Sequence, residues 1–217
     1  MTVVAFRTAA EVEAAMPLVQ RHLHRGGLLA HPTETIYGLG SRAAERDLAA
    51  LARLKRRGED KPFLLLVSSL EMAQRYDLAF TRAAQTLADR FWPGPVTLVL
   101  AGAEGRLPEA LRGPNGGIAV RWTSHPTTAT LIERLGEPIS STSANQPGKG
   151  TAPGVGAIVE MFGEAVASGD LLVLDGGVLG NVPPSTLIDC TGPEPRLIRE
   201  GAIPLNEIRA GIGRLAP

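Results

Sequence analysis

The sequence predicts an α/β fold: a single domain in which a twisted mixed β-sheet is flanked by helices. Predicted strands and helices alternate along the first part of the chain, whereas short predicted strands cluster near its end, a pattern typical of a mixed sheet. The 217 residues are 44% hydrophobic, which is enough to bury one core. Because neither an internal repeat nor a linker is visible, we predict one domain over 1–217, with its core over about 8–203.

The elements predicted in the first half have recognisable boundary signals. Thr8 and Glu11 have the spacing of a capping box, which begins a helix that Gly26 and Gly27 end. Ser68 and Glu71 form a second capping pair. The predicted elements are a helix over 8–27, a strand over 28–30, a helix over 46–57, a strand over 63–67 and a helix over 81–91.

In the second half, breaks rich in Gly and Pro separate the elements. The segment "WPGP" interrupts the chain before a strand, Pro126 suits the first turn of a helix, and "EPISSTSANQPGKGTAPG" leads from a brief strand into a long polar loop. The other predicted elements are strands over 96–102 and 118–122, a helix over 124–136, a helix near 155–162, strands over 171–177, 185–190 and 196–200, and a short helix after Pro204.

Composition excludes several classes of protein. Lys+Arg and Asp+Glu both number 22, whereas proteins that coat nucleic acid are usually more basic. Cys190 is the only cysteine, so a reducing compartment is expected. Neither a signal peptide nor an 18-residue apolar stretch is visible, which predicts a soluble, cytoplasmic protein with no membrane partner. The histidines and Cys190 lack metal-ligand spacing, so no zinc site is expected.

Three segments resemble known functional motifs, but their spacing or position in the sequence does not fit the corresponding function. "GLGSRA" (38–43) fits a dinucleotide fingerprint formally, but the polar segment "HPTET" separates it from the preceding predicted strand. We interpret its glycines as positions where the backbone passes close to other backbone or to a ligand. "PGKGT" (147–151) lacks the spacing of a P-loop. Ser143 lies outside any G-x-S-x-G motif, which disfavours a hydrolase.

Four polar segments are candidates for a ligand site. "HPTETIYGLG" (31–40) places short hydrogen-bonding side chains directly after an apolar strand. "KRRGEDKP" (55–62) suits a polyphosphate, although cations also stabilise a helix C-terminus. "SSTSAN" (140–145) can orient a ligand without adding charge, or can be an ordinary Ser-rich turn. Arg121 and Arg199, at strand ends, fit either a ligand crevice or structural salt bridges.

Taken in order, "HPTETIYGLG", "KRRGEDKP", "WPGPVTLVL", "AVRW", "STSAN", "PSTLID" and "RLIREG" closely resemble the YrdC-like family of threonylcarbamoyl-adenylate synthases. The resemblance runs from the first helix to about Ile203. It implies a single YrdC-like domain with a concave ligand-binding face. It also implies an ATP-dependent nucleotidyltransferase that makes threonylcarbamoyl-AMP and pyrophosphate from L-threonine, bicarbonate and ATP with Mg²⁺. A tRNA-modifying threonylcarbamoyl transferase complex is then the implied partner.

The resemblance also assigns roles to residues at matching motif positions. It implies catalysis by positioning and electrostatics, with no protein nucleophile and no metal-binding side chain. The residues implied for ATP are Lys55, Arg57, Ser143, Asn145 and Arg199. Those implied for threonine are Thr33, Arg121 and Ser185. Weaker candidates are Lys61, Tyr37 and Ser141.

Departures from the family pattern keep alternatives open. Gly58 stands where many relatives have proline, Leu64–Leu66 contain no histidine, and "WTSHP" (122–126) is unusual. A paralogue with an altered acyl substrate is one alternative. An RNA-binding module of the same fold is another, although neutral net charge and 4% aromatic residues weigh against it. A related carbamoyl-adenylate activity within a larger maturation system is a third, disfavoured by the short standalone chain.

Overall fold

A computed structural model describes residues 2–58 and 61–212 and confirms the predicted α/β class. Its eleven described strands form one mixed sheet in the order β1-β9-β2-β3-β8-β4-β7-β6-β10-β11, with β5 paired to β6. Parallel pairs join β1, β9 and β2, then β4 and β7, then β6 and β10, whereas the other pairs are antiparallel. The strands are β1 (Val3–Ala5), β2 (Leu28–His31), β3 (Gly38–Gly40), β4 (Leu64–Val67), β5 (Leu78–Ala79), β6 (Val96–Gly102), β7 (Ile118–Trp122), β8 (Ile139–Ser143), β9 (Leu171–Asp175), β10 (Thr186–Asp189) and β11 (Arg196–Arg199).

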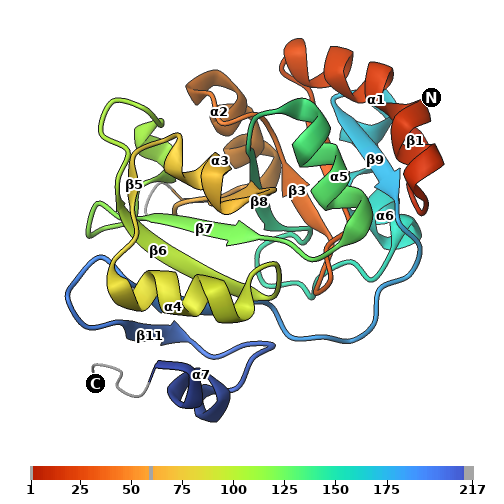
Figure 1. Ribbon diagram of the computed structural model, residues 1–217. Coiled ribbons are helices and arrows are strands. Elements are labelled where there is room, and N and C mark those ends of the chain that lie inside the picture. The colour runs from red at the N-terminus through yellow and green to blue at the C-terminus, as the bar shows by residue number, and fades with distance from the viewer. Residues whose placement is uncertain (1, 59–60, 213–217) are drawn as a thin grey trace.

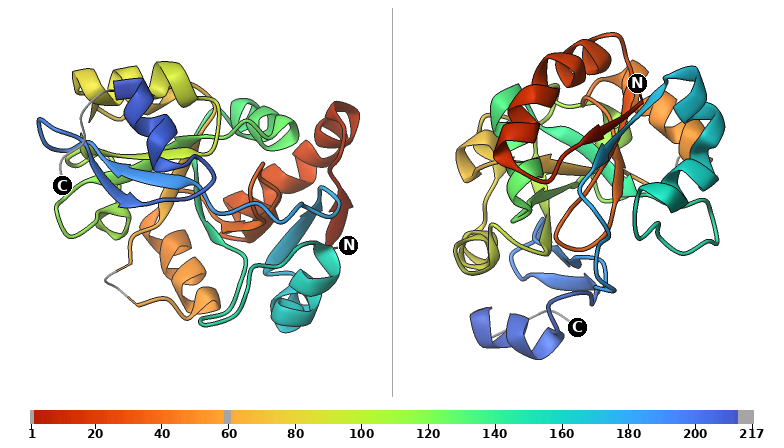
Figure 2. Two further views of the ribbon diagram at one scale, coloured as in Figure 1. Left: turned by 90° about the horizontal axis from the view of Figure 1, so that it is seen from below. Right: turned by 90° about the vertical axis from the view of Figure 1, so that its right-hand side faces the viewer.

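Helices flank this twisted sheet (Figures 1 and 2). In the described part of the chain they are α1 (Ala9–His24), α2 (Glu45–Lys55), α3 (Leu70–Gln74), α4 (Arg82–Phe91), the 3₁₀ turn η1 (Glu109–Leu111), α5 (Pro126–Leu135), α6 (Val155–Ser168) and α7 (Leu205–Ile212). Helices α1 and α5 lie side by side (Figure 1). Helix α7 packs against α4. None of these helices has both the length and the apolar character needed to span a bilayer.

Strand β9 shows how side-chain alternation divides the core. Leu172 and Leu174 pack with the apolar face of α1, whereas Leu171 and Val173 belong to the larger cluster that also contains Ile158 of α6. Because successive strand residues point to opposite faces, α1 and α6 cover opposite faces of this part of the sheet. The all-apolar run of β9 follows from that two-sided burial.

Local signals set most element boundaries as predicted. The capping box of Thr8 and Glu11 is present at the start of α1. The second capping prediction was wrong by one residue, because Ser69, rather than Ser68, accepts the backbone N–H of Met72. Helix α6 runs beyond the predicted end near residue 162, with non-helical dihedrals at Phe162, to the left-handed Gly169.

The "GLG" segment is strand β3 rather than a turn, and it joins two parts of the sheet. It pairs antiparallel with β2 on one side and with β8 on the other. A Cβ atom at Gly40 would lie 2.5 Å from the backbone oxygen of Ser140. The predicted close approach of backbone to backbone is therefore present at Gly40, and it explains why a side chain is excluded there.

Candidate functional site

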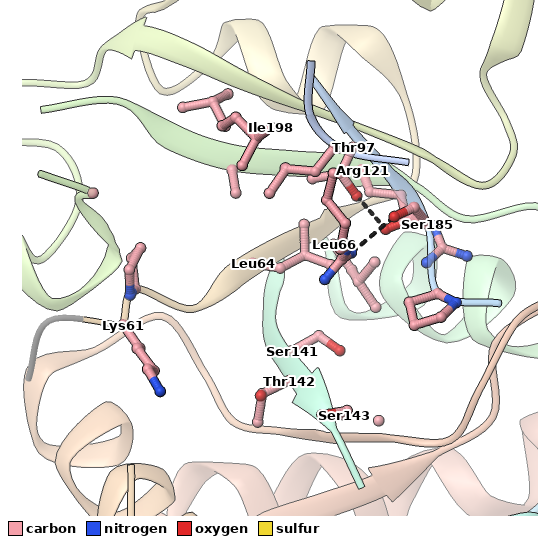
Figure 3. A pocket seen from close by; sticks show the side chains of 18 of the residues that line it. Lys61, Leu64, Leu66, Thr97, Arg121, Ser141, Thr142, Ser143, Ser185 and Ile198 are labelled. Atoms are coloured by element: carbon pink, nitrogen blue, oxygen red, sulfur yellow. Dashed lines mark hydrogen bonds between the residues drawn. The ribbon is translucent and has the colours of Figure 1, made fainter. Parts of the chain in front are cut away.

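A cavity of about 750 Å³ lies over one face of the sheet. Its lining includes alternate residues of several strands, such as Leu64 and Leu66 of β4 or Ala119 and Arg121 of β7. The intervening residues, such as Leu65, are fully buried in the core. Since alternate residues share a face, the sheet itself forms the floor of the cavity. Figure 3 shows β8 carrying Ser141, Thr142 and Ser143 along it.

Most of the predicted site residues converge on this cavity. Those that line it are Thr33, Arg57, Lys61, Arg121, Ser141, Ser143, Asn145, Ser185 and Arg199. Lys55 and Tyr37 are absent from the lining. The predicted residues that line the cavity come from segments far apart in the sequence, and the resemblance requires that they meet at one site. Their individual ligand contacts remain predictions.

Thr33 shapes the loop that follows β2. Its Oγ1 donates to the backbone oxygen of Ile36 (2.7 Å) and accepts the backbone N–H groups of Thr35 and Ile36 (both 3.2 Å). These bonds close a tight turn of the kind that threonine hydroxyls stabilise. Thr33 therefore holds the loop in shape, and it also lines the cavity.

Arg121 is held by an ion pair in the buried wall. Its Nη2 lies 2.7 Å from Oε1 of Glu34, and the side chains are 4% and 18% exposed. Both terminal nitrogens also donate to Oγ1 of Thr35 (3.3 and 3.2 Å). Its Nε is buried and has no hydrogen-bond partner within the described residues. This guanidinium is thus fixed in orientation in the wall of the cavity.

Glu34 is a structural partner as well as a charge. Its carboxylate accepts the hydroxyl of Thr123 (2.5 Å) and the backbone N–H of Ser124 (3.3 Å). Burial alone raises the pKa of Glu34, but the charge and hydrogen bonds of Arg121, with the bond from Thr123, lower it below its ordinary value. The carboxylate is therefore ionised at neutral pH, and it ties the loop after β2 to the segment after β7 that contains Thr123 and Ser124.

Lys55 lies beneath the loop that follows β8. Its Nζ donates to Ser143 O (2.5 Å), Ser143 Oγ (3.3 Å), Asn145 Oδ1 (2.5 Å) and Asn145 O. Burial and the charge of Arg57 lower the pKa of Lys55 to about 8, and four acceptors favour its charged form. The structure thus places the ammonium as an organiser of Ser143 and Asn145, which themselves line the cavity.

Arg57 and Lys61 border the cavity after α2. Arg57 donates from Nη1 to Oγ1 of Thr142 (3.0 Å) and from Nε and Nη2 to the backbone oxygens of Lys61 and Pro62 (both 2.6 Å). Its guanidinium also lies 4.9 Å from the ring centroid of Phe63, within cation–π range. Arg57 is therefore rigidly placed, whereas Lys61 offers a point charge at the rim (Figure 3).

Ser185 and Arg199 form another part of the wall. The hydroxyls of Ser185 and Thr97 lie 2.7 Å apart, and Nη2 of Arg199 donates to the backbone oxygen of Ser185 (2.8 Å). Burial lowers the pKa of Arg199, and the positive charge of Arg121 lowers it further. The cavity therefore gathers cations whose repulsion an anionic ligand relieves.

Tyr37 lies outside the cavity lining and is fully buried. Its hydroxyl donates to Gly177 O (2.8 Å) and accepts the N–H of Gly176 (2.9 Å). Burial raises the pKa of its phenol. These bonds tie the loop after β2 to the loop after β9.

Sequence reasoning missed several lining residues. Asp189 accepts the N–H (3.0 Å) and hydroxyl (2.7 Å) of Thr191, and Nη2 of Arg196 lies 3.2 Å from it. Thr35 accepts hydrogen bonds from both terminal nitrogens of Arg121, and the sequence indicated it only as one member of the polar motif "HPTETIYGLG". Asp189 is the last residue of the motif "PSTLID", in which only Ser185 was assigned a ligand role. Burial raises the pKa of the Cys190 thiol to about 12, so this cysteine is unreactive.

Residues 2–58 and 61–212 contain no group of three or more His, Cys, Asp or Glu side chains placed to hold a metal ion. Asp189 is the one carboxylate among the described lining residues, and it is already paired. Mg²⁺ commonly binds through one or two carboxylates together with substrate phosphates. The donor set of the cavity therefore fits a metal that arrives with a polyphosphate better than a dedicated protein site.

The open sheet face and its cluster of arginines and hydroxyls define an α/β protein with a cavity suited to a small anionic ligand. Residues 21–201 match the family Sua5_yciO_yrdC, described as "Telomere recombination". The chain belongs to this family, which confirms the resemblance seen in its motifs.

Curated relatives share a name. The chain is 35% identical over 194 residues to a protein of Pyrococcus abyssi and 40% identical over 185 residues to one of Thiobacillus denitrificans, both named threonylcarbamoyl-AMP synthase. These matches cover 89% and 84% of this chain, and 56% and 94% of the relatives. The chain thus spans little more than half of the Pyrococcus protein.

The fold also matches a solved structure. P. abyssi Sua5 complexed with L-threonine aligns with a TM-score of 0.86 and 33% identity, over 99% of this chain and 62% of that one. The similarity supports the predicted single mixed sheet flanked by helices.

Proposed function

We propose that this chain is a threonylcarbamoyl-AMP synthase, a nucleotidyltransferase that converts L-threonine, bicarbonate and ATP into threonylcarbamoyl-AMP and pyrophosphate. The observation that carries the proposal is the convergence of the polar family motifs on one cavity. The shared name of the relatives and the threonine complex of a relative with the same fold support the substrates.

The chemistry needs alignment and charge neutralisation. The threonine nitrogen bonds to the bicarbonate carbon as water leaves, which gives a carbamate. A carbamate oxygen then attacks the α-phosphorus, and the bond to the β-phosphate breaks to release pyrophosphate. No step needs a protein nucleophile, so the residues contribute by orientation and by electrostatic stabilisation.

Each wall of the cavity suits one part of these substrates. Arg121, a cation of fixed orientation, suits the threonine carboxylate, and Thr33 and Ser185 line the same cavity. Arg57, Lys61 and Arg199 suit the triphosphate, because guanidinium and ammonium groups bind phosphate oxygens. The loop of Ser143 and Asn145, which Lys55 holds, suits the nucleotide.

Mg²⁺ enters this proposal as part of the MgATP substrate, where it neutralises triphosphate charge. A partner transferase that passes the threonylcarbamoyl group to tRNA, and a cytoplasmic location where both substrates occur, belong to the same proposal. The RNA-binding alternative has no specific observation in its favour.

The test is incubation of the protein with ATP, Mg²⁺, bicarbonate and L-threonine, with pyrophosphate measured by a coupled assay and threonylcarbamoyl-AMP by mass spectrometry. We expect pyrophosphate release to require threonine and bicarbonate together, and Arg57→Ala or Lys55→Ala to suppress it. Release that does not depend on threonine would refute the substrate assignment.

A further inference from the structure

His31 is a buried histidine for which the proposed reaction has no role. Its side chain is fully buried, yet its Nε2 lies 3.3 Å from Oγ of Ser141, and Ser141 lines the cavity. On the other side of the ring, Nδ1 lies 3.4 Å from the backbone oxygen of Pro32. The imidazole thus connects a buried carbonyl to a hydroxyl in the cavity wall.

The two glycines of β3 leave space for this arrangement. A Cβ atom at Gly38 would lie 2.8 Å from Nε2 of His31 and 2.7 Å from Oγ of Ser141, and one at Gly40 would lie 3.2 Å from Nε2. Any larger residue at Gly38 would displace the ring or the hydroxyl. The contact between His31 and Ser141 therefore depends on the "GLG" segment.

The surroundings determine which ring nitrogen has the proton. Burial, with the neighbouring charges of His125 and Arg121, lowers the pKa of His31 to about 4, so the ring is neutral at pH 7. Glu34, in the same loop, is paired with Arg121. Because the carbonyl of Pro32 can only accept, Nδ1 has the proton and Nε2 can only accept. Ser141 must therefore donate its hydroxyl proton to His31.

This direction of donation makes Ser141 an acceptor toward the cavity. We propose that Oγ of Ser141 accepts an N–H of the amino group of the amino-acid substrate, and that His31 is the positioning residue that holds the serine hydroxyl in this orientation. The inference rests on the proposed function and assigns a substrate group to a position in that site. The carbamate nitrogen keeps one hydrogen, so the same contact can persist after the first bond has formed. Neither residue exchanges a proton with the substrate.

The inference predicts selectivity for an amino group. L-Threonine and 3-hydroxybutyrate both have a carboxylate and a β-hydroxyl, but only threonine has the N–H donors. We expect the wild-type protein to bind threonine far more tightly than 3-hydroxybutyrate. Loss of a hydrogen bond to a charged donor corresponds to an affinity change of about tenfold or more.

Calorimetric titration without ATP tests this prediction directly. We expect Ser141→Ala to weaken threonine binding about tenfold and to leave 3-hydroxybutyrate binding unchanged. His31→Phe should have a similar effect, because the hydroxyl can then rotate. His31→Gln should recover part of the affinity, because its amide oxygen can accept from Ser141 near the former position of Nε2. The double variant Ser141→Ala/His31→Phe should bind no more weakly than Ser141→Ala alone.

A matched control separates positioning from general destabilisation. His22 on α1 is also buried, and its Nε2 contacts the backbone oxygen of Leu28 (2.8 Å), away from the cavity lining. His22→Phe should lower the melting temperature without changing threonine affinity. Multiplicative effects of the two substitutions, or unchanged threonine affinity in Ser141→Ala, would overturn the inference.

The same titrations, run beside the product assay, distinguish the two proposals. A wild-type protein that binds threonine and forms threonylcarbamoyl-AMP, with Ser141→Ala unchanged in both, refutes only the role of Ser141. A wild-type protein that neither binds threonine nor forms product refutes the proposed function, and this inference with it.

Discussion

Substitution of Glu34 by alanine tests the ion pair that orients Arg121. Glu34 accepts from Arg121, Thr123 and Ser124, so its removal leaves a guanidinium that is 4% exposed without its counter-charge. Removing one partner of a buried ion pair costs about 3–5 kcal/mol, because the other charge stays buried and uncompensated. In a domain of this size, that corresponds to a fall in melting temperature of about 6–20 °C.

The same pair predicts a pH dependence. The folded pKa of Glu34 lies below its ordinary value of 4.5. The unfolded state therefore binds the proton first as pH falls. The stabilisation from the ionised carboxylate is fully present above pH 4.5 and is lost as pH falls through the lower folded pKa. Glu34→Ala should lack this contribution to the acid-side loss of stability.

Urea unfolding at pH 7, repeated at lower pH, measures both effects. Glu13→Ala is the matched control, because Glu13 also pairs with an arginine, Arg134 (2.6 Å), but the two side chains are 50% and 58% exposed. Such a pair contributes about 0–1 kcal/mol. The double variant Glu34→Ala/Arg121→Ala should lose less stability than the sum of its single variants. Equal losses in Glu34→Ala and Glu13→Ala would refute the reasoning.

Two further predictions concern space and phosphate binding. Gly38→Ala should lower the free energy of unfolding by about 1–3 kcal/mol. The control Gly156→Ala, with no atom within 4 Å of the added Cβ, should raise it by about 0.5–1 kcal/mol. Equal urea midpoints of the two variants would contradict this prediction. Arg57→Lys should raise the KM for ATP nearly as much as Arg57→Ala in the pyrophosphate assay, because lysine lacks the planar fork that contacts Thr142 and the backbone. Full activity of Arg57→Lys would show that only the charge matters.

The elements with their own local signals were predictable from sequence. Strands β6 and β7 have the predicted bounds, and the Thr8 capping box begins α1. Strand β3 was not predictable, because two of its three residues are glycines with low strand propensity. It is a strand because β2 and β8 lie on either side of it. Tertiary pairing decided its conformation, and no window of sequence contains that information.

The candidate site was predictable as a set of segments but not as a set of contacts. Arg121, Ser143 and Arg199, which belong to different family motifs, line one cavity as expected. Lys55 was expected at the phosphates, which stays a prediction, and its ammonium also contacts Ser143 and Asn145. Sequence spacing cannot separate a residue that contacts a ligand from one that supports such a residue, because both occur in the same motif.

The polar loop after β2 illustrates this division of roles. Thr33 closes its turn, Glu34 orients Arg121, and Thr35 receives both of the arginine's terminal nitrogens. The two glycines that follow admit His31 and the backbone of β8. The short polar side chains of this loop therefore serve mainly to close its turn and to hold one buried guanidinium in a fixed orientation, while the glycines leave space for the imidazole of His31. A substitution in this loop should consequently alter substrate affinity through Arg121 or Ser141, even where the substituted side chain touches no ligand.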